Sequence, residues 1–126
     1  MTIVEKSCRF SKNKFKFDLD GTVAVLDSYE MDPTNIRLFF ILVVEITDIL
    51  KEKGCTCVRM WCVQSDWDNY IKNTDWKIVT KDTKQQNIIN SLIPKEIRGE
   101  QTVLTEVEID KFPTAIAKGC GFEPVV

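Results

Sequence analysis

The sequence predicts an α/β fold of the α+β type, in which a mixed, largely antiparallel sheet surrounds one long central helix. Residues 36–50 carry apolar side chains three and four positions apart, which is the stripe of an amphipathic helix. Residues 14–20 alternate apolar and charged side chains, as a half-buried strand does, and residues 56–64 form a second strand-like run directly after the helix. At 126 residues the chain has the length of one domain, which we expect to span residues 1–126.

The first predicted strands form a hairpin. Residues 14–20 read KFKFDLD, with the apolar side chains on one face and the charged side chains on the other. Asp20-Gly21 is a signal for a two-residue turn, and residues 22–31 form the predicted returning strand. Residues 1–13 carry only weak signals.

The central helix follows a break in the pattern at DPT and is predicted to run from Ile36 to Lys53. Thr34 or Asn35 can cap its N-terminus. Residues 38–44 are apolar on every side, so we expect neighbouring elements to bury this end of the helix. The glycine after the last lysine can adopt the left-handed conformation that ends a helix.

The remaining elements are shorter. They are a helix capped by Ser65 or Asp66 with Trp67, Tyr70 and Ile71 on one face, a strand at 76–80, a helix from residue 84 to residues 91–93, a strand at 101–110, a helix that stops at Gly119, and a last strand near Phe122. On the strand at 101–110, valine and threonine alternate with glutamate, which again predicts one buried and one wetter face.

Composition excludes several classes of function. The net charge is -2 and the basic residues are scattered, so the chain lacks the basic footprint that drives nucleic-acid binding. The apolar run at 38–44 is too short to cross a bilayer, and the N-terminus lacks the apolar core of a signal peptide. We therefore expect a cytoplasmic protein that binds neither nucleic acid nor membrane.

Cysteine and histidine usage narrows the possible chemistry. The 5 cysteines have no framework or zinc spacing, which predicts reduced thiols that pack as small apolar side chains. The chain has no histidine, which removes Ser-His-Asp and Cys-His arrangements and imidazole-based zinc sites. Catalysis would have to use carboxylates, Cys, Tyr, Lys, backbone groups or a metal held by oxygen ligands.

The order of elements resembles that of the GNAT superfamily of N-acetyltransferases. FKFDLDGTVAVLDSYEMDP resembles the family's hairpin, NIRLFFILVVEITDILKEKG its central helix, CTCVRMWCVQ the next strand and GEQTVLTEVEI the closing strand. Asp75-Trp76 stands where the family has a Gly-Phe pair before a strand. The resemblance covers residues 14–110, which it implies are the core of the domain, with residues 111–126 as a C-terminal extension.

This resemblance implies a cofactor site for acetyl-CoA. In the family, backbone N–H groups at the start of the central helix bind the cofactor's pyrophosphate, which is the anion site of a helix N-terminus. The matching residues are Thr34, Asn35, Ile36 and Arg37, in a loop that contains no glycine, although glycine eases the close approach of backbone to phosphate.

The resemblance also implies catalytic groups. A carboxylate that accepts the amine proton maps to Asp27 or Glu30, and a tyrosine that protonates the leaving thiolate maps to Tyr70. The alternative interpretation of these residues is structural, with solvated carboxylates on a strand and a tyrosine packed against Trp67. The implied function is weak acyl transfer from acetyl-CoA to a small-molecule or protein amine, or a non-catalytic binding role.

A second resemblance is to the haloacid-dehalogenase-like phosphatases, whose D-x-D-G-T signature matches the DLDGT stretch. It implies that Asp18 attacks phosphorus, that Asp20 is the acid/base, and that Mg²⁺ bridges carboxylate and phosphate. The further groups that it implies are Ser65 for phosphate, Lys77 or Lys81 as the lysine, and Glu106, Glu108 or Asp110 as metal ligands. Against it, the strand at 14–20 alternates, whereas a central parallel strand is apolar on both faces.

A third hypothesis is a non-enzymatic interaction or structural protein that keeps an acetyltransferase-like fold and works through a protein partner. Trp61, Trp67, Tyr70 and Trp76 lie within a short segment, and such aromatic residues serve both cores and interfaces. The more frequent role of such residues is in the core.

Overall fold

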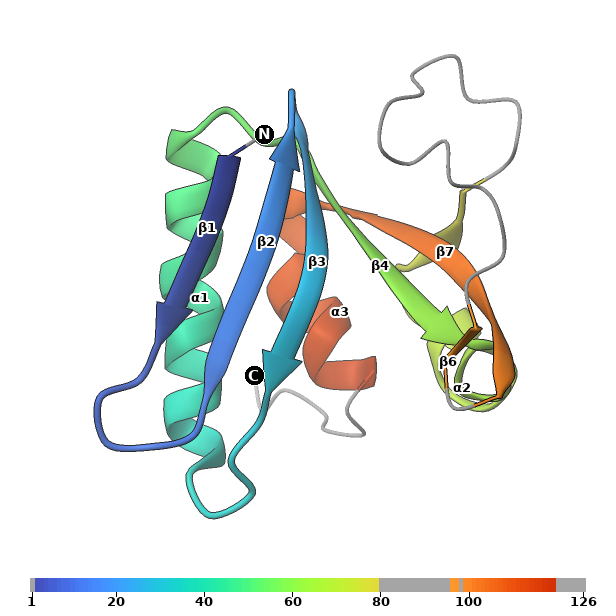
Figure 1. Ribbon diagram of the computed structural model, residues 1–126, viewed down its shortest axis with the longest axis horizontal. Helices are drawn as coiled ribbons and strands as arrows, with labels where there is room; N and C mark the ends of the chain where they lie inside the picture. Colours follow the sequence, from blue (N-terminus) through green and yellow to red (C-terminus); the bar gives the residue numbers. More distant parts are fainter. Residues whose placement is uncertain (1, 80–95, 98, 120–126) are drawn as a thin grey trace.

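The computed structural model describes residues 2–79, 96–97 and 99–119 (Figure 1). The strands are β1 (Thr2–Ser7), β2 (Lys14–Asp20), β3 (Val23–Glu30), β4 (Cys57–Val63), β5 (Lys77–Ile78), β6 (Glu96–Ile97) and β7 (Glu100–Glu108). The α-helices are α1 (Ile36–Glu52), α2 (Gln64–Asn69) and α3 (Phe112–Gly119), and short 3-10 turns lie at Ile71–Asn73 and Ile109–Lys111. The strand order is β1-β2-β3-β4-β7-β5, with β6 paired to the start of β7.

The sheet is mixed and largely antiparallel, as predicted. Every described strand pair is antiparallel except β3–β4, which α1 connects as a crossover helix. In Figure 1, α1 and α3 lie behind the sheet on the same side, and the opposite side carries no described helix over β1, β2 and β3. The predicted central helix therefore covers one face of the sheet.

An aromatic core lies between the sheet and these two helices. The Phe15 ring lies against Phe17, Phe39 and Phe112, with ring centroids 5.3–6.4 Å apart. Phe112, from the predicted C-terminal extension, also meets the ring of Trp76 edge to face at 6.2 Å. All five side chains are fully buried, so the C-terminal helix belongs to the same core as the first hairpin.

The hairpin forms as predicted, with its turn one residue later. Asp20 pairs with Val23, so the two loop residues are Gly21 and Thr22 rather than Asp20 and Gly21. Gly21 has a φ of 59°, the left-handed region that glycine enters without a steric penalty. Although the residues before position 14 carry only weak sequence signals, they include β1, an edge strand that pairs with β2 along its whole length.

The central helix begins at Ile36 as predicted and ends at Glu52, followed by a glycine with a φ of 86°. Its apolar first turns are only partly covered, which corrects the expectation that neighbours bury them. Ile41 is 46% exposed and Val44 is 53% exposed, because the sheet covers only the opposite side of the helix.

The shorter elements agree with their predictions in type. The helix α2 begins at Gln64, so Ser65 and Asp66 lie in its first turn rather than at its N-cap, which Val63 occupies. The strand predicted at 76–80 is shorter (β5), whereas β7 and α3 match. The helix predicted from residue 84 and the strand near Phe122 lie outside the described residues. Within the described chain, no helix has both the length and the apolar character needed to span a bilayer.

The surroundings of β2 differ from those of the central parallel strand that the phosphatase resemblance implies. This strand carries Asp18 and Asp20, and it lies antiparallel to both of its neighbours, β1 and β3. The side chains of β2 alternate between one buried and one wetter face. The DLDGT residues form the end of this strand and the start of the hairpin turn. Among the described residues, no group of three or more Cys, Asp or Glu side chains could hold a metal ion.

Candidate functional site

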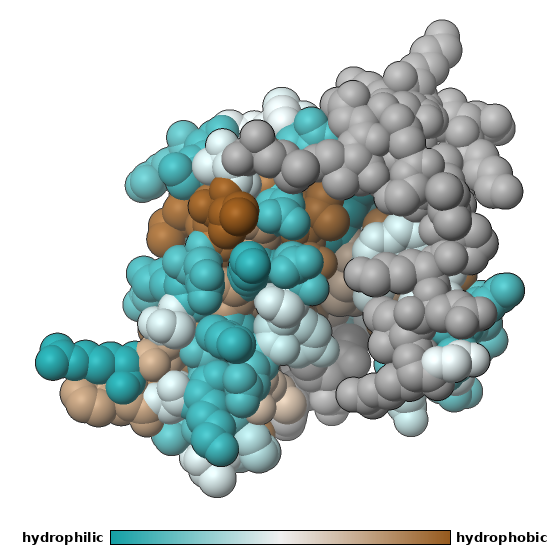
Figure 2. All heavy atoms as spheres, viewed as in Figure 1, coloured by the Kyte–Doolittle hydropathy of each residue, from teal (hydrophilic) through white to brown (hydrophobic). Residues whose placement is uncertain are grey.

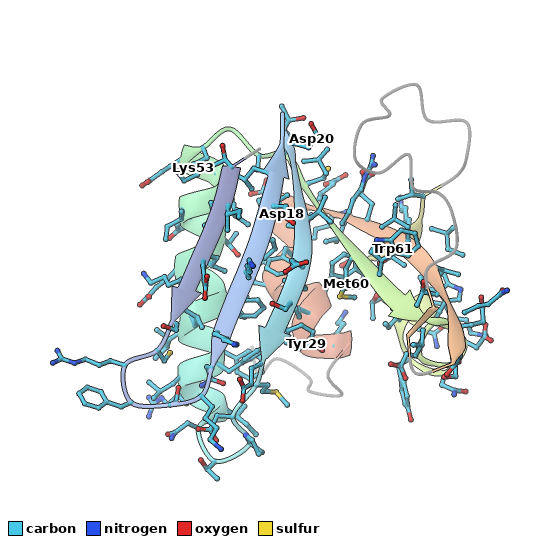
Figure 3. All side chains as sticks on the ribbon, viewed as in Figure 1. Asp18, Asp20, Tyr29, Lys53, Met60 and Trp61 are labelled. Carbon is cyan, nitrogen blue, oxygen red and sulfur yellow. The ribbon has the colours of Figure 1, made fainter. Side chains whose placement is uncertain are left out.

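The sheet opens between β3 and β4. These parallel strands pair over only four positions, from Val23 with Cys57 to Leu26 with Met60. Beyond this point β3 continues along β2, and β4 continues along β7, so the two strands diverge (Figure 1). In Figure 3, Tyr29 of β3 and Met60 of β4 lie on the two sides of this opening. Among the described residues, no strand pairs with the facing edges of β3 and β4 beyond this point.

A β-bulge marks the place where the opening begins. Lys16 pairs with Ser28 and Phe17 pairs with Leu26, so Asp27 has no partner residue on β2. A bulge bends its strand and increases the local twist, which turns the end of β3 away from β4. The register shift on β2 and the end of the β3–β4 pairing therefore coincide at Leu26 and Asp27.

The start of α1 lies at the same end of the sheet, because a short loop connects it to the end of β3. Asp32 organises this loop: its Oδ1 accepts hydrogen bonds from the N–H and hydroxyl of Thr34, at 3.0 and 2.6 Å, and its Oδ2 accepts one from the N–H of Lys12 at 3.2 Å. The hydrogen bonds to Thr34 and Lys12 lower the pKa of the Asp32 carboxyl below its usual range.

Asn13 holds the same loop against the first hairpin. Its side chain is fully buried. Its Oδ1 accepts a hydrogen bond from the N–H of Asp32 at 2.6 Å, and its Nδ2 donates to the carbonyl of Asn35 at 3.1 Å. Because both ends of the loop are held, the first turn of α1 has a fixed position relative to the opening.

The predicted cofactor residues lie in this loop and this first turn. Asn35 is the N-cap residue of α1, but its side chain makes no capping hydrogen bond. Thr34 donates to Asp32 and so is not directed at the helix. Ile36 and Arg37 form the first turn, where backbone N–H groups lack partners within the helix.

The predicted catalytic residues lie on both sides of the opening. Asp27 and Glu30 belong to β3, and Tyr70, which is 59% exposed, follows α2 beyond β4. The Oδ2 of Asp27 lies 3.8 Å from Nζ of Lys16 on β2, so this carboxylate is on the sheet face away from the helices. Among the described contacts, none connects Tyr70 with either carboxylate, so the structure does not bring these three residues together.

Cysteine thiols in β4 are held protonated. Burial, together with the nearby carboxylates of Glu106 and Asp66, respectively, raises the pKa of Cys57 and of Cys62 to about 12. Thiols with such pKa values are weak nucleophiles at neutral pH. The four described cysteines are all free, in line with the predicted reduced thiols, and Cys120 lies outside the described residues.

Two polar features beside the opening were missed by sequence reasoning. Arg59 is buried on β4, and its Nε lies 2.7 Å from Oε1 of Glu106 on β7. Glu100, at the start of β7, accepts a hydrogen bond at 2.7 Å from the N–H of Ser65 in the first turn of α2. Hydrogen bonds from the side chain and the N–H of Ser65 lower the pKa of this carboxyl. The charge alternation on the strand at 101–110 was the available signal, but it does not identify the partners.

The aromatic residues between 61 and 76 divide between core and surface. Trp76 is buried, Trp61 and Trp67 are partly buried against the hydrophobic clusters, and Tyr70 is largely exposed. The expectation that Tyr70 packs in the core with Trp67 is therefore wrong, whereas the tryptophans are core residues or border the core.

Several solved structures with a similar fold are N-acetyltransferases, and another is a CoA-dependent acyl-homoserine lactone synthase. The ribosomal-protein-S18-alanine N-acetyltransferase from Escherichia coli matches 85% of this chain with a TM-score of 0.52 and 13% identity. An N-acetyltransferase from Thermoplasma acidophilum, solved in complex with coenzyme A, matches 84% with a TM-score of 0.50 and 15% identity. A CoA-dependent acyl-homoserine lactone synthase, solved with SAM and isopentyl-CoA, matches 98% with a TM-score of 0.54 and 10% identity.

These similarities establish the fold. The chain spans 69%, 60% and 67%, respectively, of the lengths of these three proteins. No protein-family model and no curated protein sequence matches the chain. The predicted resemblance to the GNAT fold is confirmed, and the resemblance to the phosphatases finds no support.

Proposed function

We propose that this chain binds an acyl-CoA in the opening between β3 and β4 and transfers the acyl group, at a low rate, to an amine. The observation that carries the proposal is the divergence of the only parallel strand pair among the described strands, directly after Leu26 and Met60. A thioester between two such strands can accept hydrogen bonds from backbone N–H groups that no described neighbouring strand uses.

The start of α1 supports the same site. The first turn of this helix presents backbone N–H groups and the positive end of the helix dipole, a combination that binds phosphate. Arg37 adds a positive charge, and the bonds from Asn13 and Asp32 hold the loop in place. Coenzyme A carries a pyrophosphate at one end and the thioester at the other, so one ligand could occupy both the helix end and the opening. Two solved structures with this fold contain coenzyme A or an acyl-CoA.

The reaction would follow the usual course of acyl transfer to an amine. The amine nitrogen attacks the thioester carbonyl carbon, and backbone N–H groups beside Met60 stabilise the resulting oxyanion. Asp27 or Glu30 accepts the amine proton through water, and the intermediate collapses by breaking the carbon–sulfur bond. Tyr70 donates a proton to the leaving thiolate. The separation of these groups in the structure is consistent with weak rather than efficient turnover.

Ligand binding is tested by thermal unfolding with acetyl-CoA, with CoA and with ADP as a pyrophosphate control. A ligand bound only by the folded state stabilises it by about 2.7 kcal/mol when its concentration is 100 times Kd. We expect acetyl-CoA and CoA to raise the midpoint more than ADP does. Arg37→Ala should reduce the shift, and Lys53→Ala, which removes a positive charge at the other end of the same helix, should not. Equal midpoints with and without acetyl-CoA would reject the proposed site.

Turnover is tested by the release of free CoA thiol in the presence of a panel of primary amines. We expect Asp27→Asn and Tyr70→Phe to lower the rate by at least tenfold, which corresponds to about 1.4 kcal/mol in the barrier. Asp48→Asn, which alters an exposed carboxylate on α1, is the matched control. Unchanged rates in both variants would reject the catalytic roles proposed for Asp27 and Tyr70, even if acyl-CoA binds.

A non-catalytic binding role is the second candidate, and the loop before α1 favours it. This loop contains no glycine, and its geometry is fixed by hydrogen bonds from Thr34 and Asn13 to Asp32 and Asn35. A loop of this kind cannot easily approach a pyrophosphate as closely as glycine would allow. A folded protein whose unfolding midpoint neither acetyl-CoA nor CoA raises would support this role.

A further inference from the structure

The outward face of α1 is apolar although it lies away from the sheet. We define this face by the five residues that line one recess on its surface: Arg37, Phe40, Ile41, Val44 and Glu45. Ile41 is 46% exposed and Val44 is 53% exposed, and both line a shallow recess on the protein surface. A helix face that meets only water is normally polar, so an exposed apolar face indicates a contact with another surface.

Two opposite charges flank this apolar face. Among the described residues Arg37 makes no salt bridge. Glu45 pairs with Lys6 of β1 through Oε2, at 2.9 Å, and its side chain is still 48% exposed. The helix thus offers, at one end of the apolar face, a cation that no described residue pairs in a salt bridge, and an accessible carboxylate at the other end.

The pattern of this face is symmetric about Ile41. Arg37 and Glu45, which carry opposite charges, lie four positions before and after it. Because a helix has about 3.6 residues per turn, positions four before and four after are rotated by equal and opposite angles of about 40°. Two copies of the helix that run antiparallel, related by a two-fold axis at Ile41, therefore present identical residues to one another in opposite order.

We propose that the outward face of α1 binds a second copy of this chain through an antiparallel pairing of the two helices. In this arrangement Arg37 of each copy lies level with Glu45 of the other, within reach of its long side chain, and the Ile41 and Val44 side chains of both copies form the apolar centre. A two-fold interface must be complementary to itself, and opposite charges placed symmetrically about an apolar centre satisfy that requirement. The proposal does not depend on the proposed acyl transfer.

The interface is small, so the dimer should be weak. One face of a single helix buries less than the standard interface of about 1,600 Å², and interfaces at the low end of the range are transient. Exposed ion pairs are also screened by salt, with a Debye length of about 10 Å at 0.1 M. We expect a reversible monomer–dimer equilibrium that shifts toward monomer as salt is added.

Charge reversal tests the pairing directly. In sedimentation velocity at low salt, without acyl-CoA, R37E alone should lose at least tenfold in dimer affinity, because glutamate then faces Glu45. E45K alone should lose a similar factor, because Arg37 then faces lysine. A mixture of the two variants should dimerise again, since one chain places glutamate opposite lysine and the other keeps arginine opposite glutamate. Recovery on mixing cannot come from a variant that fails to fold.

Two matched controls isolate the interface. K53E reverses an exposed charge at the other end of α1 and should leave the dimer unchanged. K6Q removes the partner of Glu45 within the chain without touching the proposed contacts, so it should not weaken the dimer. A wild-type chain that stays monomeric throughout its soluble range, or a mixture that dimerises no better than either variant alone, would overturn the proposal. Because no acyl-CoA is present, the result is separate from the binding test above.

Discussion

The two faces of the sheet bury their side chains by different means. The face toward α1 and α3 is dry and aromatic, with the rings of Phe15, Phe17, Phe39 and Phe112 in contact. The opposite face, seen in Figure 2, is largely hydrophilic over β2 and β3, with smaller hydrophobic patches between the polar side chains. The first face is stabilised by the area removed from water, and the second depends on paired charges at a few positions.

The opposite face has a buried part and an exposed part. Near β4 and β7, Val23, Val79 and Leu104 form a small buried cluster, and the Arg59–Glu106 ion pair lies on the same face of these strands. Along β2 and β3, ion pairs such as Lys16–Asp27 are exposed to water. The two ion pairs therefore contribute differently to the free energy of unfolding, because water screens the Lys16–Asp27 pair and is largely excluded from the Arg59 side chain.

The largest expected effect lies on the helix-covered face. Phe15→Ala removes a fully buried ring that contacts the rings of Phe17, Tyr29, Phe39 and Phe112. Such a deletion loses the transfer free energy and leaves a cavity, so we expect the free energy of unfolding to fall by about 3–5 kcal/mol. Urea unfolding measures this change. A loss below about 1 kcal/mol would mean that the core can collapse around the site and is not closely packed.

The Arg59–Glu106 pair should have an intermediate effect. The Arg59 side chain is only 5% exposed, and that of Glu106 is 39% exposed. Breaking a fully buried pair costs about 3–5 kcal/mol, and partial hydration of Glu106 should reduce the cost of Arg59→Met to about 1–3 kcal/mol.

The double variant sharpens this prediction. In Arg59→Met/Glu106→Gln no carboxylate is left without its partner, so we expect it to recover at least half of the loss. A double-mutant cycle from urea unfolding measures the coupling between the two sites. If the two single losses simply add, the two side chains do not interact energetically, and the ion pair is not what stabilises this face.

The difference between the two faces also explains what the sequence could predict. In β2, the alternation of apolar and charged side chains was sufficient to predict the strand and its buried face, because one face of this strand is dry and the other wet. In β4 the same reasoning would place Arg59 on a wetter face, but its side chain is buried beside Glu106 of β7. Its partner is 47 positions away in the sequence, and no local pattern shows such a pairing.

The candidate site shows the same division between local and distant causes. Asp32-Pro33-Thr34 carries a local signal, because an aspartate that bonds the backbone two residues later is common in turns. The role of Asn13 could not be predicted, since it depends on contacts with a loop that lies 19–22 positions away. The opening between β3 and β4 follows from the order of elements that the resemblance implied, whereas the bulge at Asp27 depends on register and has no sequence signal of its own.

The smallest expected effect lies on the exposed part of the opposite face, and it decides how the catalytic test can be interpreted. The Lys16–Asp27 pair has an N–O distance of 3.8 Å, and its side chains are 39% and 44% exposed. Exposed pairs contribute about 0.2–1 kcal/mol, so Asp27→Asn should change the free energy of unfolding by less than about 0.5 kcal/mol at moderate salt. Lys16→Gln should have an equally small effect. With stability unchanged, any loss of amine-dependent thiol release in Asp27→Asn reports on the reaction rather than on folding; a loss of more than about 1 kcal/mol would instead show that Asp27 supports the bulge.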